Sequence, residues 1–157
     1  MPELTPPDEL RGLTIHQPWA NAIASNEKRI ENRAWRYAPT YCGWVAIHAG
    51  AATATQYAVE RVAEITGTPV DVVMQRSRAR SVILAVARLA AVCSESAGAT
   101  ELVCGCGPWA MPGQRHFRLA DVRPIPSPVP CKGALGLWRL PSHVDAAVRA
   151  QLGERVA

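Results

Sequence analysis

The sequence predicts one α+β domain, a mixed β-barrel of five or six short strands flanked by two to four helices. Strand-like segments occur both early and late in the chain, and segments with helical spacing lie between and after them. No internal repeat and no linker divides the chain into two cores. A length of 157 residues, with 48% hydrophobic and 19% charged residues, suits one globular core that needs neither disulfides nor metals.

The beginning of the chain is predicted to be a loose arm at residues 1–11, because it holds three prolines and four charges without any periodicity. The domain would then comprise residues 12–157. A short strand or turn at 13–15 would be its first element, since its apolar residues lead directly into a polar, proline-containing run.

A helix is predicted to follow at Pro18, a residue that suits the first helical turn because its missing N–H has no partner there anyway. Trp19, Ala22 and Ile23 have the i, i+3, i+4 spacing of one buried helical face. Asn26 tolerates the left-handed conformation that is common just past a helix end. The helix should therefore stop near Asn26.

The next segments read as two strands and two helices. Residues 29–35 roughly alternate charged with apolar or small side chains, and 43–48 form a second strand whose even-numbered and odd-numbered residues face opposite sides. A helix capped by Thr53 is expected to run to about Thr66. Gly67-Thr68-Pro69 should end it, before a short second helix at 70–78.

The clearest central strand is 81–89, which is rich in β-branched residues and apolar on both faces. Residues 98–113 are predicted to be a loop because of their glycines and prolines, and 116–123 alternate as a strand. Four prolines make 124–130 an extended connection with few backbone donors. The remaining elements are a strand at 135–140 and a helix from Ser142 to about Leu152.

Several classes of protein do not fit this sequence. The longest apolar stretch, residues 81–93, is interrupted by Arg88 and is too short to span a bilayer. The N-terminus is acidic and proline-rich, unlike a secretory signal. We therefore expect a cytoplasmic protein without a membrane partner.

Five cysteines, an odd number with irregular spacing, indicate reduced thiols rather than a disulfide framework. Cys104 and Cys106 could chelate a metal together with His116. This set nevertheless lacks the two well-spaced ligand pairs that are typical of a structural zinc site. The favoured interpretation is that these are buried or loop thiols, and neither a metal nor another cofactor is expected.

Positive charge is concentrated in two places, although the net charge of +4 is modest. The first cluster comprises Lys28, Arg29, Arg33 and Arg36 beside Glu31, and the second comprises Arg76, Arg78, Arg80 and Arg88. Such clusters are typical of phosphate binding, although the solvated face of a helix or strand is the commoner explanation for any one run of charges.

Four segments carry a more specific pattern: Leu13-Thr14-Ile15-His16-Gln17-Pro18-Trp19-Ala20, Lys28-Arg29-Ile30-Glu31-Asn32-Arg33-Ala34-Trp35, Gly43-Trp44-Val45-Ala46-Ile47-His48-Ala49 and Lys132-Gly133-Ala134-Leu135-Gly136-Leu137-Trp138-Arg139-Leu140. In this order they resemble the ASCH family (activating-signal-cointegrator homology). The His-Gln-Pro-Trp-Ala run and the Lys-Gly…Trp ending are most similar to the branch that contains the C-terminal ASCH domain of the transcription coactivator activating signal cointegrator. The resemblance implies a PUA-like β-barrel with a cleft beside its first helix that holds RNA or DNA.

This resemblance and the chemistry of the side chains together predict a nucleic-acid-binding set. Its members are His16, Gln17, Trp19, Lys28, Glu31, Arg33, Trp35, His48, Arg88, Lys132 and Gly133. Lys28 and Lys132 would provide point charges for phosphate, and Arg33 can hold a phosphate through two parallel donors. The expected partner is RNA or DNA that is single-stranded or has exposed bases.

The aromatic members would offer stacking faces to unpaired bases, and Gln17 can both donate to and accept from a base edge. Trp19 has helical spacing with apolar neighbours, so it is either a stacking platform or a core residue. The tryptophans assigned to packing are Trp44, Trp109 and Trp138.

The charged members also allow two interpretations. Arg88 lies inside an apolar strand, so it is expected either to point into the cleft or to pair with an acid such as Glu31. Glu31 and Arg33 lie two residues apart, hence on one strand face, where they can pair with each other. Glu31 could instead orient Lys28 or Arg33 within the cleft.

The resemblance also leaves an enzymatic alternative open. Some small bacterial ASCH proteins are amidohydrolases that act on acetylated cytidine through a lysine, a threonine and a glutamate. Lys28 matches that lysine, but Glu31 stands where those enzymes have threonine, and the downstream glutamate could be Glu95 or Glu101. Lys28 and Glu31 are therefore the catalytic candidates.

A ribonuclease is a further possibility, since another ASCH protein has that assignment and His16 or His48 with Lys28 could flank a phosphate. The chain lacks Gly-x-Ser-x-Gly, His-Glu-x-x-His and Walker motifs. We therefore predict a nucleic-acid-binding module rather than an enzyme. The remaining alternative is a protein-interaction domain in transcription or translation.

Overall fold

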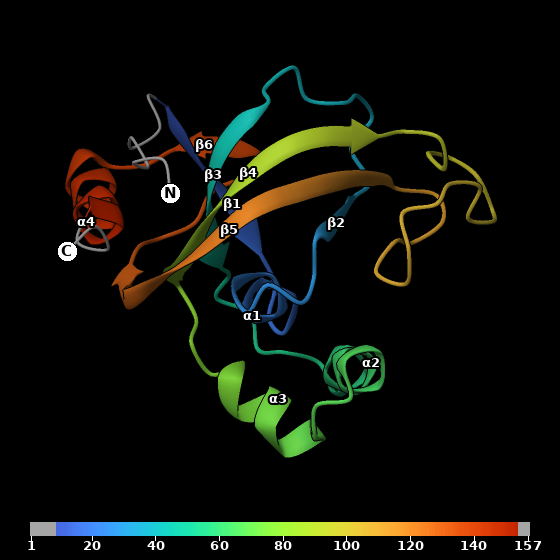
Figure 1. The fold of residues 1–157 in the computed structure, drawn as a ribbon, viewed down its shortest axis with the longest axis horizontal. Coiled ribbons are helices and arrows are strands. Elements are labelled where there is room, and N and C mark those ends of the chain that lie inside the picture. The colour runs from blue at the N-terminus through green and yellow to red at the C-terminus, as the bar shows by residue number, and fades with distance from the viewer. Residues whose placement is uncertain (1–8, 154–157) are drawn as a thin grey trace.

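The computed structural model describes residues 9–153, which form six strands and four helices (Figure 1). In chain order these are β1 (Leu10–Ile15), α1 (Trp19–Ala24), β2 (Ile30–Arg33), β3 (Gly43–Ala49), α2 (Gln56–Thr66), α3 (Val70–Arg76), β4 (Val82–Cys93), β5 (Arg115–Pro130), β6 (Leu137–Arg139) and α4 (Ser142–Gly153). The first strand starts three residues before the predicted one. Most of the predicted arm at 1–11 lies outside the described residues.

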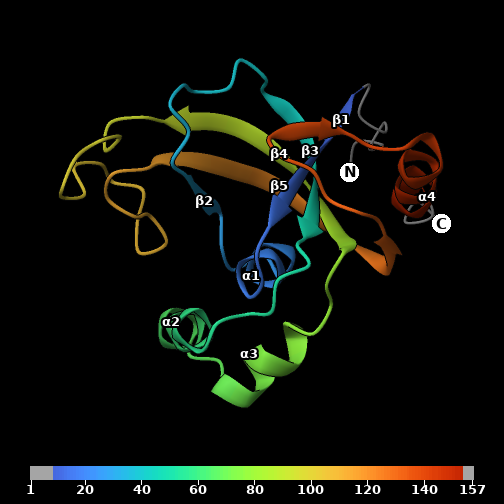
Figure 2. The same cartoon turned by 180° about the vertical axis from the view of Figure 1, so that it is seen from behind.

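The strands form one mixed, curled sheet in the order β2-β5-β4-β3-β1-β6 (Figures 1 and 2). Neighbouring strands are antiparallel except β1 and β3, which are parallel. Within residues 9–153, β2 and β6 are the two edges, so the sheet is a half-barrel that stays open between them. The predicted α+β class, with six strands and four helices, is thus confirmed.

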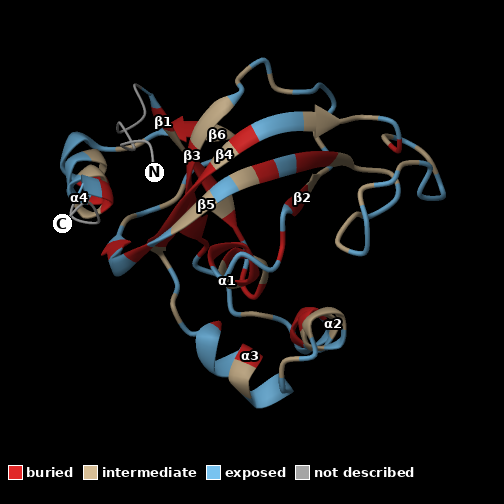
Figure 3. Ribbon diagram, viewed as in Figure 1, coloured by how far each residue is buried: buried red, intermediate tan, exposed pale blue. Residues whose placement is uncertain are grey.

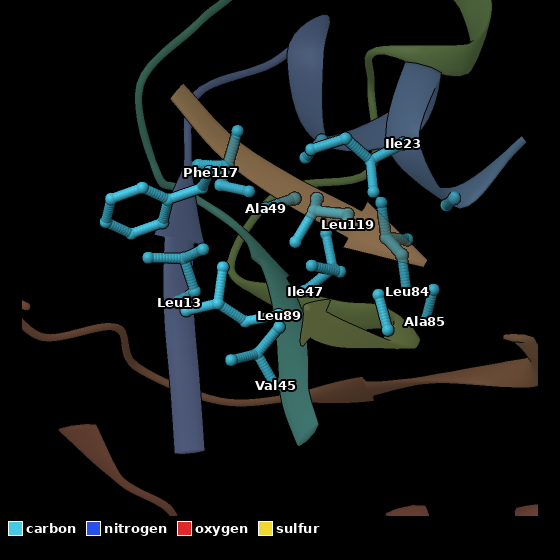
Figure 4. Close-up of a cluster of buried hydrophobic side chains, with 14 residues drawn as sticks. Leu13, Ile23, Val45, Ile47, Ala49, Leu84, Ala85, Leu89, Phe117 and Leu119 are labelled. Carbon is cyan, nitrogen blue, oxygen red and sulfur yellow. The ribbon is translucent and has the colours of Figure 1, made fainter. Parts of the chain in front are cut away.

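The main core lies where α1 packs against β1, β3, β4 and β5 (Figure 4). Leu13, Ile47 and Phe117 are completely buried there. Val45 joins this cluster with Ile47, whereas Ala46 faces a second cluster that is covered by α4. The alternating faces predicted for this strand are therefore correct. Each fully buried aliphatic side chain stabilises the folded chain by about 1.5–3 kcal/mol.

Helix α1 has the limits that its flanking residues dictate. It begins directly after Pro18 and ends at Ala24, and Asn26 adopts the predicted left-handed conformation with φ of 61°. Ile23 faces the sheet, whereas Ala22 packs against α2 and α3. Figure 3 shows that α1 is mostly buried, because it lies between the sheet and these two helices.

The cap of α2 differs from the prediction. The Thr55 hydroxyl accepts a hydrogen bond from the Ala58 backbone N–H at 3.2 Å, so Thr55 is the N-cap. Thr53, the predicted cap, instead accepts a hydrogen bond from Arg80. The helix ends as predicted at Gly67, whose φ of 73° is favourable for glycine.

The proline-rich segment 124–130 was predicted as an extended connection; it is extended, but as a continuation of strand β5. It remains paired with β4, from Ala85 opposite Pro124 to Val82 opposite Pro130. In the described sheet, β2 pairs with β5 only at residues 115–118. The prolines therefore lie where β5 has a strand neighbour on one side, a position that tolerates a missing N–H.

Strands β4 and β5 are both longer than predicted and form an extended hairpin. The connecting loop, residues 94–114, projects from the end of the hairpin that lies away from α4 (Figure 1). Across residues 9–153, no helix has the length and apolar character that crossing a membrane requires.

Candidate functional site

A cleft of about 970 Å³ opens beside α1. This volume is near the upper limit for small-molecule pockets, which is ~1,000 Å³. Its walls come from the end of β1, from α1, β2 and α2, from the 94–114 loop and from the turn before β6. The predicted site residues that line it are His16, Trp19, Lys28, Glu31, Arg33 and Trp35. Lining residues that the sequence did not reveal include Thr14, Asn32, Tyr57, Arg61, Trp109, Met111 and Leu135.

Lys28 lies at the base of this cleft with only 1% of its surface exposed. Its Nζ donates hydrogen bonds to Glu31 Oε2 at 2.7 Å and to the Ile30 carbonyl oxygen. The ammonium also lies 5.9 Å from the centre of the Trp19 ring, within the range of a cation–π contact. A buried lysine is tolerated only with such compensation, so Lys28 is held by its neighbours.

Arg33 stands on the other side of the same carboxylate. Its Nε is 3.5 Å from Glu31 Oε1, and one Nη donates to the Thr14 carbonyl oxygen at 2.6 Å. Among the side chains of residues 9–153, the Arg33 Nε is buried without a hydrogen-bond acceptor. Two cations therefore share one carboxylate, which leaves the Lys28–Glu31–Arg33 group with a net charge of +1 and a donor that needs an oxygen.

Aromatic rings form the apolar walls of the cleft. Trp19 meets Trp109 edge to face at 6.3 Å, and Trp35 meets Phe117 in the same way at 5.1 Å. Trp109 was assigned to packing alone, yet it also lines the cleft. This position could not be predicted from the sequence, because Trp109 reaches the cleft through a loop whose path no local pattern defines.

That loop is fixed to β2 by one side chain. Asn32 donates from its amide to the Trp109 carbonyl oxygen at 2.8 Å, and its Oδ1 accepts from the Met111 N–H at 2.8 Å. Asn32 thus bonds the backbone of the loop on both sides of Ala110. The position of the loop wall relative to the Lys28–Glu31–Arg33 group depends on these two bonds.

Two of the predicted residues are buried supports rather than part of the cleft surface. Gln17 donates to the Ala79 carbonyl oxygen at 2.8 Å and accepts from the Asn21 N–H, which occupies both ends of its amide. His48 is 1% exposed and bonds the Cys131 carbonyl oxygen through Nε2 and the Thr14 hydroxyl through Nδ1. Polar residue type suggested a ligand contact for both, but tertiary burial gives them backbone partners instead.

The last three predicted residues also lie outside the lining of the cleft. Arg88 pairs with Asp121 at 2.8 Å on a solvent-exposed part of the sheet, so of the two expectations it pairs with an acid, but that acid is Asp121 and not Glu31. Lys132 is exposed beyond the lining residues. Gly133 packs so closely on Thr14 and His48 that a Cβ atom would lie 2.6 Å from the Thr14 hydroxyl oxygen. Gly133 is therefore a packing requirement.

Known proteins resemble this chain at the level of the fold. Neither a family model nor a curated protein sequence matches the chain. Among solved structures, ASCH from Zymomonas mobilis aligns over 90% of this chain and 94% of its own, with a TM-score of 0.51 and 14% sequence identity. The chain therefore shares the fold of this ASCH structure. At 14% identity the likeness to this ASCH structure concerns the fold and not the residues of the cleft beside α1.

Within this ASCH fold, the two catalytic candidates, Lys28 and Glu31, lie together in the cleft, whereas the other residues considered for catalysis take different positions. Glu95 and Glu101 are exposed on the 94–114 loop, outside the described lining of the cleft. His16 is exposed at the rim of the cleft, whereas His48 is buried behind it. Among the described residues, the cleft lining thus includes Lys28, Glu31 and His16 but neither downstream glutamate.

Proposed function

We propose that the cleft binds an unpaired stretch of RNA or DNA. The observation that carries this proposal is the buried Lys28–Glu31–Arg33 group, whose net charge of +1 lies at the base of a tryptophan-lined cleft. A buried positive charge with an unsatisfied donor favours an anionic oxygen ligand, and a phosphodiester provides one next to a flat base.

The two cations would have different roles in this proposal. Arg33 lines the cleft with a side chain that is 20% exposed, so the exposed part of its guanidinium can bond a phosphate oxygen directly, while its buried Nε stays beside Glu31. Lys28 is enclosed, with its ammonium engaged by Glu31 and Ile30. It would contribute its charge to the field of the cleft rather than a direct phosphate contact, which revises the role expected from the sequence.

The aromatic walls would bind the bases. Stacking on an aromatic side chain contributes typically about 1–3 kcal/mol per base and tolerates different sequences. Trp19, Trp35 and Trp109 line the cleft, and Tyr57, with 76% of its surface exposed, lies at its rim. These faces favour splayed, unpaired bases over a duplex, whose stacked bases present only their edges.

Two finer expectations belong to the same proposal. The His-Gln-Pro-Trp-Ala run and the Lys-Gly…Trp ending support kinship with the coactivator branch of ASCH domains. Five free thiols and a nucleic-acid partner support a location in the cytoplasm, where thiols stay reduced.

Fluorescence anisotropy with labelled single-stranded RNA and DNA oligonucleotides tests the proposal. Arg33→Gln should weaken binding at least about tenfold, equivalent to ~1.4 kcal/mol. Arg88→Gln makes the same chemical change on an exposed surface outside the cleft, so its affinity should stay close to that of the native chain. The salt dependence of affinity should become shallower in Arg33→Gln alone.

Two results would reject the proposal. Equal losses in Arg33→Gln and Arg88→Gln would mean that binding is nonspecific and lies outside the cleft. Failure of both RNA and DNA to bind at low salt would favour the protein-interaction alternative. The same mixtures, analysed for cleaved RNA and for deacetylated cytidine, would reveal turnover if the chain were a hydrolase.

A further inference from the structure

Four potential metal ligands meet at the end of the β4–β5 hairpin, apart from the cleft residues described above. Cys93 is the last residue of β4, and His116 stands directly opposite it on β5. Cys104 and Cys106 come from the connecting loop. The three sulfur atoms and a His116 ring nitrogen all lie within 4.8 Å of one another.

The spacing of these atoms suits a tetrahedral ion. Zinc bonds of about 2.3 Å to sulfur and 2.0–2.1 Å to nitrogen place tetrahedral ligand atoms roughly 3.5–3.8 Å apart. Cys104 Sγ lies 3.2 Å from His116 Nδ1, and the widest separation in the group exceeds the ideal value by about 1 Å. Small side-chain rotations would therefore complete the coordination sphere without moving the strands.

His116 is already oriented as a metal ligand. Its side chain is fully buried, and Nε2 lies 2.7 Å from the Met111 carbonyl oxygen. A carbonyl oxygen only accepts, so Nε2 carries the proton and Nδ1 presents its lone pair toward Cys104. Metal-binding histidines characteristically have such a carbonyl partner on the other ring nitrogen.

The surroundings also suit a charged zinc–thiolate centre. Three thiolates and a neutral imidazole around Zn²⁺ would have a net charge of −1. The Arg118 guanidinium lies 3.4 Å from Cys106 Sγ and would offset that charge. The Ser96 hydroxyl lies 3.3 Å from Cys104 Sγ and accepts from the Val103 N–H, which curls the backbone around the sulfur.

The loop itself needs a constraint of this kind. Residues 94–114 contain no helix and no strand in the structure, and a connection of this length is uncommon in compact domains unless it is functional or disordered. The same loop carries Trp109 to the wall of the cleft. Simple packing of thiols would not explain why a buried, oriented imidazole joins three of them.

We propose that Cys93, Cys104, Cys106 and His116 bind one Zn²⁺ ion in a closed structural site. Four protein ligands leave no open position for substrate, so the ion would stabilise the loop rather than activate water. Thiolate and imidazole ligands in tetrahedral arrangement select zinc over magnesium or calcium, which prefer oxygen ligands. Cys93 is the ligand that sequence spacing could not reveal, because strand pairing brings it to the site.

Metal reconstitution of the full chain under reducing conditions tests this proposal. Elemental analysis should find one zinc per chain, and Co²⁺ substitution should give the visible bands of a tetrahedral thiolate complex. Cys104→Ser should lower zinc affinity at least tenfold. Cys42→Ser alters an exposed thiol outside the group and should retain full zinc content.

A second measurement on the native chain does not depend on the stability of any variant. Alkylation mapped by mass spectrometry should modify Cys42 in both forms, but Zn²⁺ should protect Cys93, Cys104 and Cys106 until a chelator is added. Absence of bound zinc, equal protection with and without zinc, or a disulfide between two of these cysteines in place of zinc would overturn the proposal. None of these readouts depends on nucleic-acid binding.

Discussion

Replacing Glu31 with glutamine leaves a buried lysine without its counter-charge. Lys28 is 1% exposed, and its ammonium donates to Glu31 Oε2 at 2.7 Å. The glutamine oxygen and the Ile30 carbonyl can still accept hydrogen bonds, so the change removes mainly the negative charge. Breaking a buried ion pair in this way costs about 3–5 kcal/mol, and we expect the lower end, about 3 kcal/mol.

The assays are urea unfolding and thermal unfolding, both followed by the fluorescence of the five tryptophans. For a domain of this size, 1 kcal/mol shifts the midpoint of thermal unfolding by about 2–4 °C, so Glu31→Gln should unfold about 6–12 °C lower. Asp121→Asn is the matched control, because it removes the same charge from an exposed pair with Arg88. That control should change stability by at most about 1 kcal/mol.

A double variant separates the charge from the packing. Lys28→Met with Glu31→Leu replaces the pair by apolar side chains of similar volume, which should restore stability to within about 1 kcal/mol of the native chain or raise it. Arg33 keeps its bond to Thr14 in that variant, and its side chain reaches water. A cost below about 1 kcal/mol for Glu31→Gln, or an equally large loss in the double variant, would refute the assignment of a low-dielectric ion pair.

Three further outcomes are expected. Gly133→Ala should destabilise the fold by about 1–3 kcal/mol, because its Cβ would lie 2.6 Å from Thr14 Oγ1 and 2.8 Å from His48. Gly105→Ala is the control, because a Cβ there would meet no atom within 4 Å and should not change stability. Equal urea midpoints for the two variants would contradict this prediction. Burial lowers the pKa of His48 in the folded chain. Below a pH of about 6.5 the unfolded chain therefore binds a proton at this histidine that the folded chain does not bind, and the free energy of unfolding falls as the pH drops toward the lowered pKa. Urea titrations should show that His48→Gln lacks this part of the pH dependence. Chelation of the proposed zinc should loosen residues 108–112 and weaken oligonucleotide binding, measured by anisotropy, roughly tenfold (about 1.4 kcal/mol). Unchanged affinity would mean that the loop wall does not contact the ligand.

Local sequence patterns predicted most of the fold. The helical spacing around Trp19 and the left-handed tendency of Asn26 defined α1, because both depend on near neighbours in the chain. The proline-rich half of β5 was predicted to be extended but not to pair as a strand, since proline is compatible with an edge segment and edge position is a property of the whole sheet. The choice between Thr53 and Thr55 as helix cap depended on Arg80, which is distant in sequence.

The candidate site was predicted in part for a similar reason. Lys28, Glu31 and Arg33 lie in one short segment, so their proximity could be inferred from the sequence, and the structure does place them together. His48 and Gln17 have suitable chemistry for a ligand site, but burial assigns them to backbone partners. Burial results from packing between distant segments, which residue type alone does not specify.

The enclosed lysine has a second effect, on how the sheet ends. Strand β2 is an edge of the described sheet, and an edge strand can pair with a strand of another molecule. The Lys28 ammonium donates to the carbonyl oxygen of Ile30, the first residue of β2. Inward-pointing charge is one of the devices by which natural proteins prevent edge-to-edge association. The side chain that adds positive charge to the cleft therefore also occupies the first carbonyl oxygen of this edge strand, which is then engaged within the domain.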